Sequence, residues 1–597
     1  MSTYIRLTDY KESDSKEQGF FKSENRYEAK QDDFEKIPGS PIIYWFQNKI
    51  IDKFQGKLLS EIPIYTGMAT SDNDKFLRFW QECEMKNINF SANAIEDTFC
   101  REKWFPYNKG GSIRKWYGNF EYIVNFQNDG IEIKDEVNRK YPYLKGNTGF
   151  YIRYQEHYFK QGITWSAVSS GRFSVRLHSK NSIFSNAGFV AIPDNDFLFY
   201  MSLMNSSFSY YVISALAQTI NNNASDIEKL PVIFPKQEST KQTIDTLTQE
   251  CIDISKEDWD SRETSWDFTA SPLLIENGKL RIENGKIEDA YNAYCEYWKE
   301  KFYQLHANEE ELNRLFIDIY ELGDELTPDV ALKDITILKS ESIINDNNEL
   351  EFKADEIMKQ FISYAVGVMF GRYSLDKDGL QIANLGSEIL ISQMTDETKV
   401  SFPIDDDNVI PVLEDDYFSD DIASRVINFV KTTFGSESLS ENINFIEKCL
   451  GKTIRAYMVK DFYEDHIKRY KKRPIYWMVS SPKKGFMSLS YMHRYTNDLF
   501  ARVQNNYLRE YITKLEGTKD ILRQIIVDES ASSKDKKDAD KKIKDIENKL
   551  KELISFDRDV LTSYAQNRVD IDLDDGVKVN YNKFKEVLYP IKGLDKE

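Results

Sequence analysis

The sequence contains few of the residues that build disulfide or metal sites. It has five cysteines and five histidines among 597 residues. The cysteines, Cys83, Cys100, Cys251, Cys295 and Cys449, are far apart, odd in number and never spaced as C-x-x-C. Disulfide frameworks and zinc ribbons need closely spaced, paired cysteines. Neither is therefore predicted, and the scattered histidines are expected to be packed or surface residues with no metal bound.

Long apolar runs are also missing. A membrane-spanning helix needs about 20 apolar residues in succession, whereas the longest candidate here, residues 364–370, ends just before Arg372. The first 18 residues lack the basic-then-apolar order of a secretory signal. We therefore expect a cytoplasmic protein with no membrane contact. Its 41% hydrophobic and 14% aromatic content predicts a folded chain, and its length predicts several domains.

The charge is negative overall but unevenly distributed. A net charge of -19 argues against general nucleic-acid binding, because uniform negative charge repels phosphate. Residues 101–180, however, contain 14 lysines and arginines against 7 aspartates and glutamates, a local charge of +7. A basic face on an acidic body predicts oriented, site-selective binding of an anion such as DNA.

The centre of this basic region is the stretch 103–128, KWFPYNKGGSIRKWYGNFEYIVNFQN. Its cations Lys109, Arg114 and Lys115 are predicted to contact phosphates or base edges. Gly110 and Gly111 would let a backbone approach a ligand closely. The aromatic residues could stack on bases or could form an ordinary core, and composition alone favours neither; they are Trp104, Phe105, Tyr107, Trp116 and Tyr117.

Two further segments are candidate DNA contacts. Alternation after residue 171 predicts a strand with a polar, cationic face that carries Arg172, Arg176 and Lys180. An ordinary solvated strand face is the alternative. The polar loop that includes Thr70, Ser71 and Asn73 could offer hydroxyls and N–H groups to DNA, although Ser71 and its neighbour Asp72 could simply cap the next helix.

The remainder reads as mainly helical. Helices are predicted over 197–217, 306–322, 357–373 and 498–526, and residues 543–553 are predicted to complete an antiparallel pair. Residues 405–421 contain eight carboxylates and are expected to form a solvated acidic loop, whereas 466–497 are basic. The predicted division is an entry arm or linker (1–36), an α/β domain (37–235), a helical spacer (236–400), a mixed α/β domain (401–497) and a helical hairpin with a tail (498–597).

Several segments, in order, resemble the PglX family of adenine-specific DNA methyltransferases from BREX phage-defence systems, which are themselves similar to type IIG restriction-modification enzymes. The segments are IPGSPIIYW (37–45), TGMATSDNDKFLRFW (66–80), residues 103–130, residues 162–192, HANEEELNRLFIDIY (306–320), SYAVGVMFGRYSLDKDGL (363–380), SLSYMHRY (488–495) and DIDLDDGVKVNY (570–581). The resemblance is to the family's carboxy-terminal half. It implies that the mixed α/β domain 37–235 is a target-recognition domain for double-stranded DNA, followed by a mainly α-helical region.

The sequence departs from this family at the motifs that carry the chemistry. Adenine methyltransferases hold the flipped base with an NPPY-type tetrapeptide and hold S-adenosylmethionine at a glycine-rich turn after a strand. This sequence has no Pro-Pro pair and no Gly-x-Gly, so no catalytic, metal or cofactor residue is predicted in it. S-adenosylmethionine is expected on a catalytic partner chain, and other BREX subunits are expected partners.

We therefore interpret the chain as the DNA-specificity portion of such an enzyme, not catalytic alone. Two alternatives stay open: a fragment of a complete site-specific methyltransferase, and a scaffold subunit of the defence complex that binds no DNA.

Overall fold

The computed structural model describes the chain apart from residues 9, 169–170, 218–220, 277–278, 281–284 and 595–597. Two serines of the segment 162–192 quoted above therefore lie outside the described residues. The chain divides into two compact units. Unit 1 comprises residues 1–76, 89–259 and 300–337, and unit 2 comprises 77–88, 260–299 and 338–597. The five-part division expected from the sequence stays a prediction.

Unit 1 is built on two small sheets. One has the strand order β3 (Ile64–Tyr65), β10 (Gly188–Ala191), β7 (Gly162–Ser166), β8 (Arg176–His178), with antiparallel neighbours. In the other, β6 (Tyr122–Asn125) pairs antiparallel with β5 (Trp104–Asn108), which pairs in parallel with β9 (Ile183–Phe184). Every residue of β5 is buried. The aromatic and β-branched residues of these strands suit a buried pleated surface, and they form the core of the unit.

Helices and a short amino-terminal hairpin complete unit 1. The predicted helix 197–217 is in fact two helices, α6 (Phe197–Asn205) and α7 (Ser207–Leu216). Ser206 separates them because its backbone is extended and its hydroxyl accepts a hydrogen bond from the Ser209 N–H, as an N-cap does. The other elements are β1 (Ser2–Ile5), α1 (Ser13–Phe20), β2 (Arg26–Ala29), α2 (Gln31–Glu35), α3 (Asn48–Ile51), α4 (Asn73–Phe76), α5 (Gln127–Lys140), α8 (Ala224–Ile227), α9 (Glu238–Asp260) and the second half of α10 (Ile287–Tyr320).

Unit 2 packs helices around a three-stranded sheet. The order is β15 (Ile410–Pro411), β17 (Met487–Tyr491), β16 (Tyr476–Ser480), all antiparallel. The predicted helix 357–373 is α11 (Ala354–Met369). A Cβ atom at Gly367 would lie 2.6 Å from the Tyr373 ring, so glycine serves close packing here. The other helices are α12 (Glu388–Met394), α13 (Ile422–Phe434), α14 (Leu439–Leu450), α15 (Ile454–Lys460), α16 (Phe462–Arg469), α17 (Leu499–Arg502), α20 (Thr562–Asn567) and α21 (Gly576–Asn582). The short strands are β4 (Leu77–Phe79), β11 (Ile275–Glu276), β12 (Lys279–Leu280), β13 (Ser342–Ile344) and β14 (Leu350–Phe352).

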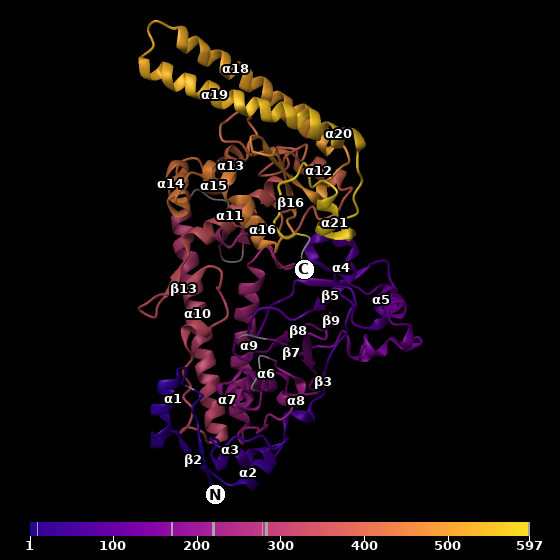
Figure 1. Ribbon diagram of the computed structural model, residues 1–597, viewed down its shortest axis with the longest axis vertical. Helices are drawn as coiled ribbons and strands as arrows, with labels where there is room; N and C mark the ends of the chain where they lie inside the picture. Colours follow the sequence, from indigo (N-terminus) through magenta and orange to yellow (C-terminus); the bar gives the residue numbers. More distant parts are fainter. Residues whose placement is uncertain (9, 169–170, 218–220, 277–278, 281–284, 595–597) are drawn as a thin grey trace. The chain divides into compact units, whose positions relative to one another are not determined.

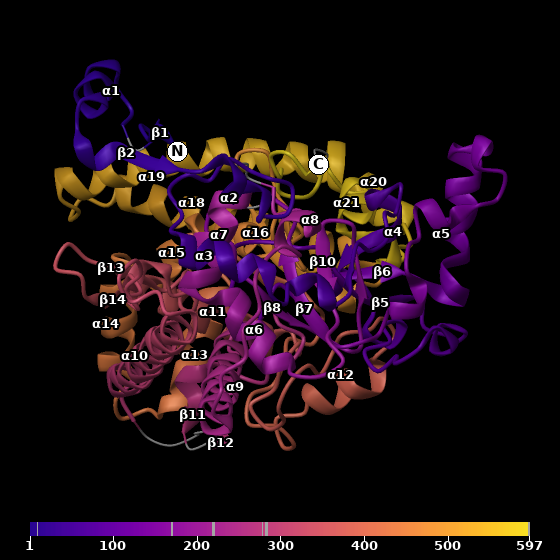
Figure 2. The same cartoon turned by 90° about the horizontal axis from the view of Figure 1, so that it is seen from below.

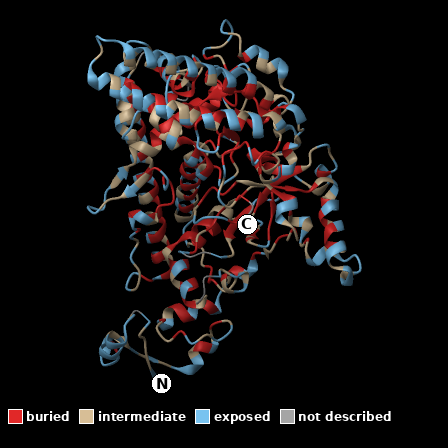
Figure 3. Cartoon of the chain, turned by 45° about the horizontal axis from the view of Figure 1, so that its top comes forward, coloured by how far each residue is buried: buried red, intermediate tan, exposed pale blue. Residues whose placement is uncertain are grey.

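The carboxy-terminal helical pair is present as predicted. Helix α18 (Arg509–Val527) and helix α19 (Ser533–Phe556) lie side by side and are joined by a short turn (Figure 1). Ser532 caps α19 by accepting a hydrogen bond from the Asp535 N–H. Much of the pair is exposed (Figure 3). Among the described residues no helix is both long and apolar enough to cross a membrane.

The basic segment 466–497 is exposed in part, at Lys468, Lys471, Lys472, Lys483 and Lys484. His466, His493 and Arg494 are buried. Arg469 pairs with Glu263 at 3.2 Å, so part of the segment's positive charge is neutralised inside unit 2. His466, Arg469, His493 and Arg494 therefore contribute to the interior of the unit and add little to a basic surface.

The acidic segment 405–421 is solvated as expected at Asp406, Glu414, Asp415 and Asp416, but not at its two ends. Asp405 and Asp421 are buried. Asp421 caps α13 by accepting from the Ser424 N–H at 3.0 Å and pairs with Arg455 at 2.8 Å. Asp405 accepts from the Val409 N–H at 2.9 Å. A count of carboxylates could not predict this burial, because it does not show which of them bind other residues within the fold.

Asp405 provides a test of this burial. Burial, and next the charge of Asp407, raise the pKa of Asp405 to about 7. The folded state therefore holds its proton more tightly than the unfolded state, so ionisation costs stability as pH rises from about 4 through 7. Asp405→Asn keeps an amide oxygen that can accept from Val409. At pH 8 we expect this variant to unfold at a higher urea concentration than the wild type, with a free energy of unfolding that is larger by on the order of 3 kcal/mol.

At pH 4 the effect of Asp405 ionisation in the folded state should be absent, because Asp405 is then protonated in the folded state and about half protonated in the unfolded state. The difference between the two proteins should therefore be much smaller than at pH 8. Asp406→Asn, a change to the exposed neighbour, is the matched control. A wild type and Asp405→Asn variant that differ equally at pH 4 and pH 8 would contradict the interpretation.

Candidate nucleic-acid interface

The aromatic residues of the stretch 103–128 form core. Trp104 and Phe105 are fully buried and Trp116 is 1% exposed. These rings cannot stack on bases, so of the two readings left open by the sequence, the core reading is confirmed. The two glycines let their turn pack closely against another part of the same chain. Gly110 has φ +89°, and a Cβ there would lie 3.0 Å from the Ala187 carbonyl oxygen.

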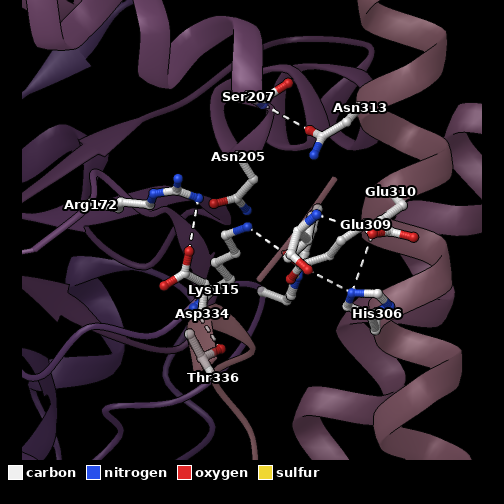
Figure 4. A network of polar contacts seen from close by, with 12 residues as sticks. Lys115, Arg172, Asn205, Ser207, His306, Glu309, Glu310, Asn313, Asp334 and Thr336 are labelled. Atoms are coloured by element: carbon white, nitrogen blue, oxygen red, sulfur yellow. Dashed lines mark hydrogen bonds and ion pairs between the residues drawn. The ribbon is translucent and has the colours of Figure 1, made fainter. Parts of the chain in front are cut away.

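Two predicted DNA contacts are held in ion pairs within unit 1. The Lys115 Nζ lies 2.6 Å from Oε2 of Glu309 on α10, and the Trp116 Nε1 donates to Oε1 of the same carboxylate at 2.8 Å (Figure 4). Arg114 pairs with Asp258 on α9 at 3.0 Å and stacks over Trp259. Only 14% of the Lys115 side chain and 16% of the Arg114 side chain are exposed. Both cations therefore fasten the stretch to α9 and α10.

The prediction of an exposed cationic strand face is wrong. Strand β8 contains only Arg176–His178, and both Arg176 and His178 are buried. Arg176 donates to Oδ1 of Asn108 at 3.3 Å. Burial lowers the pKa of Arg176 to about 10. Burial, and next the charge of Arg176, lower the pKa of His178 to about 3, so His178 is neutral. Phe173 and Val175 are buried as the alternation predicted, but Arg176 on the opposite face is buried too, against Asn108 of the second sheet.

The remaining predicted cations are more accessible. Arg172 is half exposed, pairs with Asp334 at 3.0 Å (Figure 4) and lies over the Tyr210 ring. Lys109 lies with its Nζ 5.0 Å from the centre of the Tyr122 ring. Lys180 is exposed, and no hydrogen-bond or ion-pair partner of its side chain is found among the described residues. These three keep part of their charge at the surface of unit 1.

The loop of Thr70, Ser71 and Asn73 is ordered by its own side chains. Thr70 is buried and donates to Oδ1 of Asn73 at 2.7 Å. Asp72 accepts from the Lys75 N–H at 3.1 Å and begins α4, so the capping alternative is confirmed for Asp72. Ser71 has φ +65°, and its carbonyl oxygen accepts from the Lys140 Nζ at 3.1 Å.

Next to this loop lies a surface that the sequence reasoning missed, residues 141–154, which we call the aromatic segment. Its backbone joins the loop because the Ala69 N–H donates to the Tyr151 carbonyl oxygen at 2.8 Å. It follows α5 and extends away from β5 and β6 (Figure 2). Its signal is readable: no acid occurs between Glu136 and Glu156, whereas five aromatic residues do, namely Tyr141, Tyr143, Phe150, Tyr151 and Tyr154.

The described residues do not fit an S-adenosylmethionine site. Strand β5 pairs in parallel with β9. The double-glycine turn Gly110–Gly111 follows β5 but leads on to β6, whereas a nucleotide-type site needs such a turn to open a helix.

Comparison with known proteins found two similar curated sequences. No family model matches the chain. It is 36% identical over 621 residues to the adenine-specific methyltransferase PglX of Lacticaseibacillus casei (strain Zhang), a match that covers 99% of this chain and 49% of that protein. It is 34% identical over 616 residues to the adenine-specific methyltransferase BrxX of Escherichia coli O9:H4 (strain HS), covering 99% and 48%. The chain thus spans about half the length of the curated relatives it matches.

Among solved structures, the type IIL restriction-modification enzyme MmeI in complex with DNA matches with a TM-score of 0.30 and 13% identity, over 45% of this chain and 34% of that one. This likeness is too weak to carry an argument.

Proposed function

We propose that this chain is the DNA-recognition portion of a BREX-type adenine-specific DNA methyltransferase that acts in phage defence. The observation that carries the proposal is the match along 99% of the chain to about half of two adenine-specific methyltransferases. The sequence lacks Pro-Pro and Gly-x-Gly, so S-adenosylmethionine-dependent transfer would come from residues that this sequence does not contain, in a catalytic partner.

The proposed recognition surface belongs to unit 1 and is smaller than the sequence suggested. Lys109, Arg172 and Lys180 keep their place in it, and the loop 70–73 joins it through the aromatic segment. Arg114, Lys115 and Arg176 support it from inside, where their partners hold the strands and turns in place. Phosphate contacts would set the register, and one or two side chains would read base edges.

Duplex binding over a salt series tests this proposal. The chain should bind double-stranded DNA with an affinity that falls as salt rises, because each phosphate contact releases counterions and adds about 0.9 to the slope of log K against log salt. Lys180→Ala should lower the slope by roughly one contact, whereas Lys115→Ala should lower stability and leave the slope nearly unchanged. Salt-insensitive binding, or none, would favour the scaffold alternative.

A further inference from the structure

The aromatic segment exposes three large rings. Tyr143 is 71% exposed, Phe150 61% and Tyr154 46%. Behind them Tyr141 and Tyr151 stack on each other, with ring centres 4.7 Å apart and planes 16° from parallel. Clustered exposed apolar faces carry a solvation cost and mark binding surfaces. Tyr143 packs edge-on against Tyr141 and Phe150 against Tyr151, with ring centres 6.1 and 5.8 Å apart, so the stacked pair supports these two exposed rings.

The charge of the segment identifies an anionic partner. Residues 137–155 contain four cations and no acid. Two of them are tied down: Arg139 pairs with Glu136, and Lys140 pairs with Asp72 and Glu136. The other two are Lys145, which is exposed, and Arg153.

Arg153 is fixed against an exposed ring. Its guanidinium lies 4.9 Å from the centre of the Phe150 ring, and its Nε donates to the Phe150 carbonyl oxygen at 2.8 Å. A cation and a ring face are thus presented together. That combination suits a nucleotide, whose base offers a flat face and whose phosphate offers a negative charge.

The aromatic segment is held in place by the loop of Thr70, Ser71 and Asn73, which comes earlier in the chain. Lys140 donates to the Ser71 carbonyl oxygen at 3.1 Å, and the Ala69 N–H binds the Tyr151 carbonyl oxygen. At its other end Tyr154 packs against Tyr65 of β3, which stacks on His157 with ring centres 3.8 Å apart. A surface fixed at both ends binds without a large ordering cost.

We infer that the aromatic segment binds DNA bases that have left the duplex stack, with Tyr143 and Phe150 stacking on the bases and Lys145 and Arg153 at the neighbouring phosphates. This inference rests on the proposed function, and it specifies which part of the DNA this surface binds. Paired bases inside a duplex bury their faces against one another, so exposed rings gain little from intact DNA. Unstacked bases offer free faces, and stacking on them tolerates any sequence.

Three probes test it with the full chain: a paired duplex, the same duplex with a short central mismatch bubble, and its single strand. The bubble duplex should bind roughly tenfold more tightly than the paired one, and Phe150→Ala or Tyr143→Ala should each weaken bubble binding by about threefold, so that the two together remove most of that gain. Neither variant should change the salt slope. Lys145→Ala should lower the slope by about one contact.

Phe99→Ala is the matched control, because Phe99 is 64% exposed like Phe150 but follows Glu96 and Asp97. It should leave binding to all three probes unchanged. Equal binding of bubble and paired duplex, or equal effects of Phe99→Ala and Phe150→Ala, would overturn this inference and leave the proposed function standing. No binding to any probe would overturn both.

Discussion

Glu309→Ala is expected to lower the free energy of unfolding by about 3 kcal/mol. Glu309 is 2% exposed, and its two oxygens accept from the Lys115 Nζ and the Trp116 Nε1. Its removal leaves a largely buried ammonium and a buried indole N–H without partners, and that desolvation cost is larger than the net value of the pair. Urea denaturation of the full chain, followed by tryptophan fluorescence, measures the change.

Two companion variants separate charge from packing. Glu311→Ala removes an exposed carboxylate two residues along α10 that pairs with Arg314, and it should cost about 0.5 kcal/mol or less. Lys115→Met combined with Glu309→Gln should recover most of the lost stability, because no charge remains buried and the amide oxygen can still accept from Trp116. A stable Glu309→Ala variant would show that Lys115 is free for DNA.

Gly67→Ala is expected to destabilise unit 1 by about 3 kcal/mol or more and to abolish duplex binding. A Cβ at Gly67 would lie 1.9 Å from the Phe184 carbonyl oxygen, a backbone atom that cannot rotate away. The same oxygen accepts from the Met68 N–H at 3.0 Å. The methyl group would therefore separate residues 67–69 from β9 and displace the loop 70–73 that follows.

Gly323→Ala serves as the control, since a Cβ there meets no atom within 4 Å and its φ lies outside the left-handed region. It should change stability by less than about 1 kcal/mol. Denaturation of both variants, with duplex binding measured beside it, checks the prediction. If Gly67→Ala unfolded like the wild type, residues 67–69 would not be fastened to β9 as the structure places them.

The sequence predicted features that depend on near neighbours. Helix α11 and the pair of α18 and α19 follow from apolar spacing, and Gly367 follows from the crowding that such a helix creates. The break at Ser206 was missed although serine is a favoured N-cap, because the apolar pattern continues across it.

Charge partners could not be predicted because they lie far away in the chain. Lys115 and Glu309 are separated by 194 positions and Arg114 and Asp258 by 144, so nothing local distinguishes a paired cation from a free one. The prediction for Arg176 was wrong for a related reason. Alternation shows that a strand has two faces, but the packing of a second sheet decides whether the polar face reaches solvent. The acid-free, aromatic composition of residues 141–154 is a readable signal, whereas the longer stretch 103–128, with the same kind of composition, is core.

The central claim is that this chain selects where an adenine methyltransferase acts. Genome-wide mapping of adenine methylation tests it most directly, in cells that carry the catalytic partner with this chain and in cells that carry the partner alone. We expect methylation at one defined site sequence when the chain is present and its loss when the chain is absent. Unchanged methylation in the absence of the chain would contradict the account.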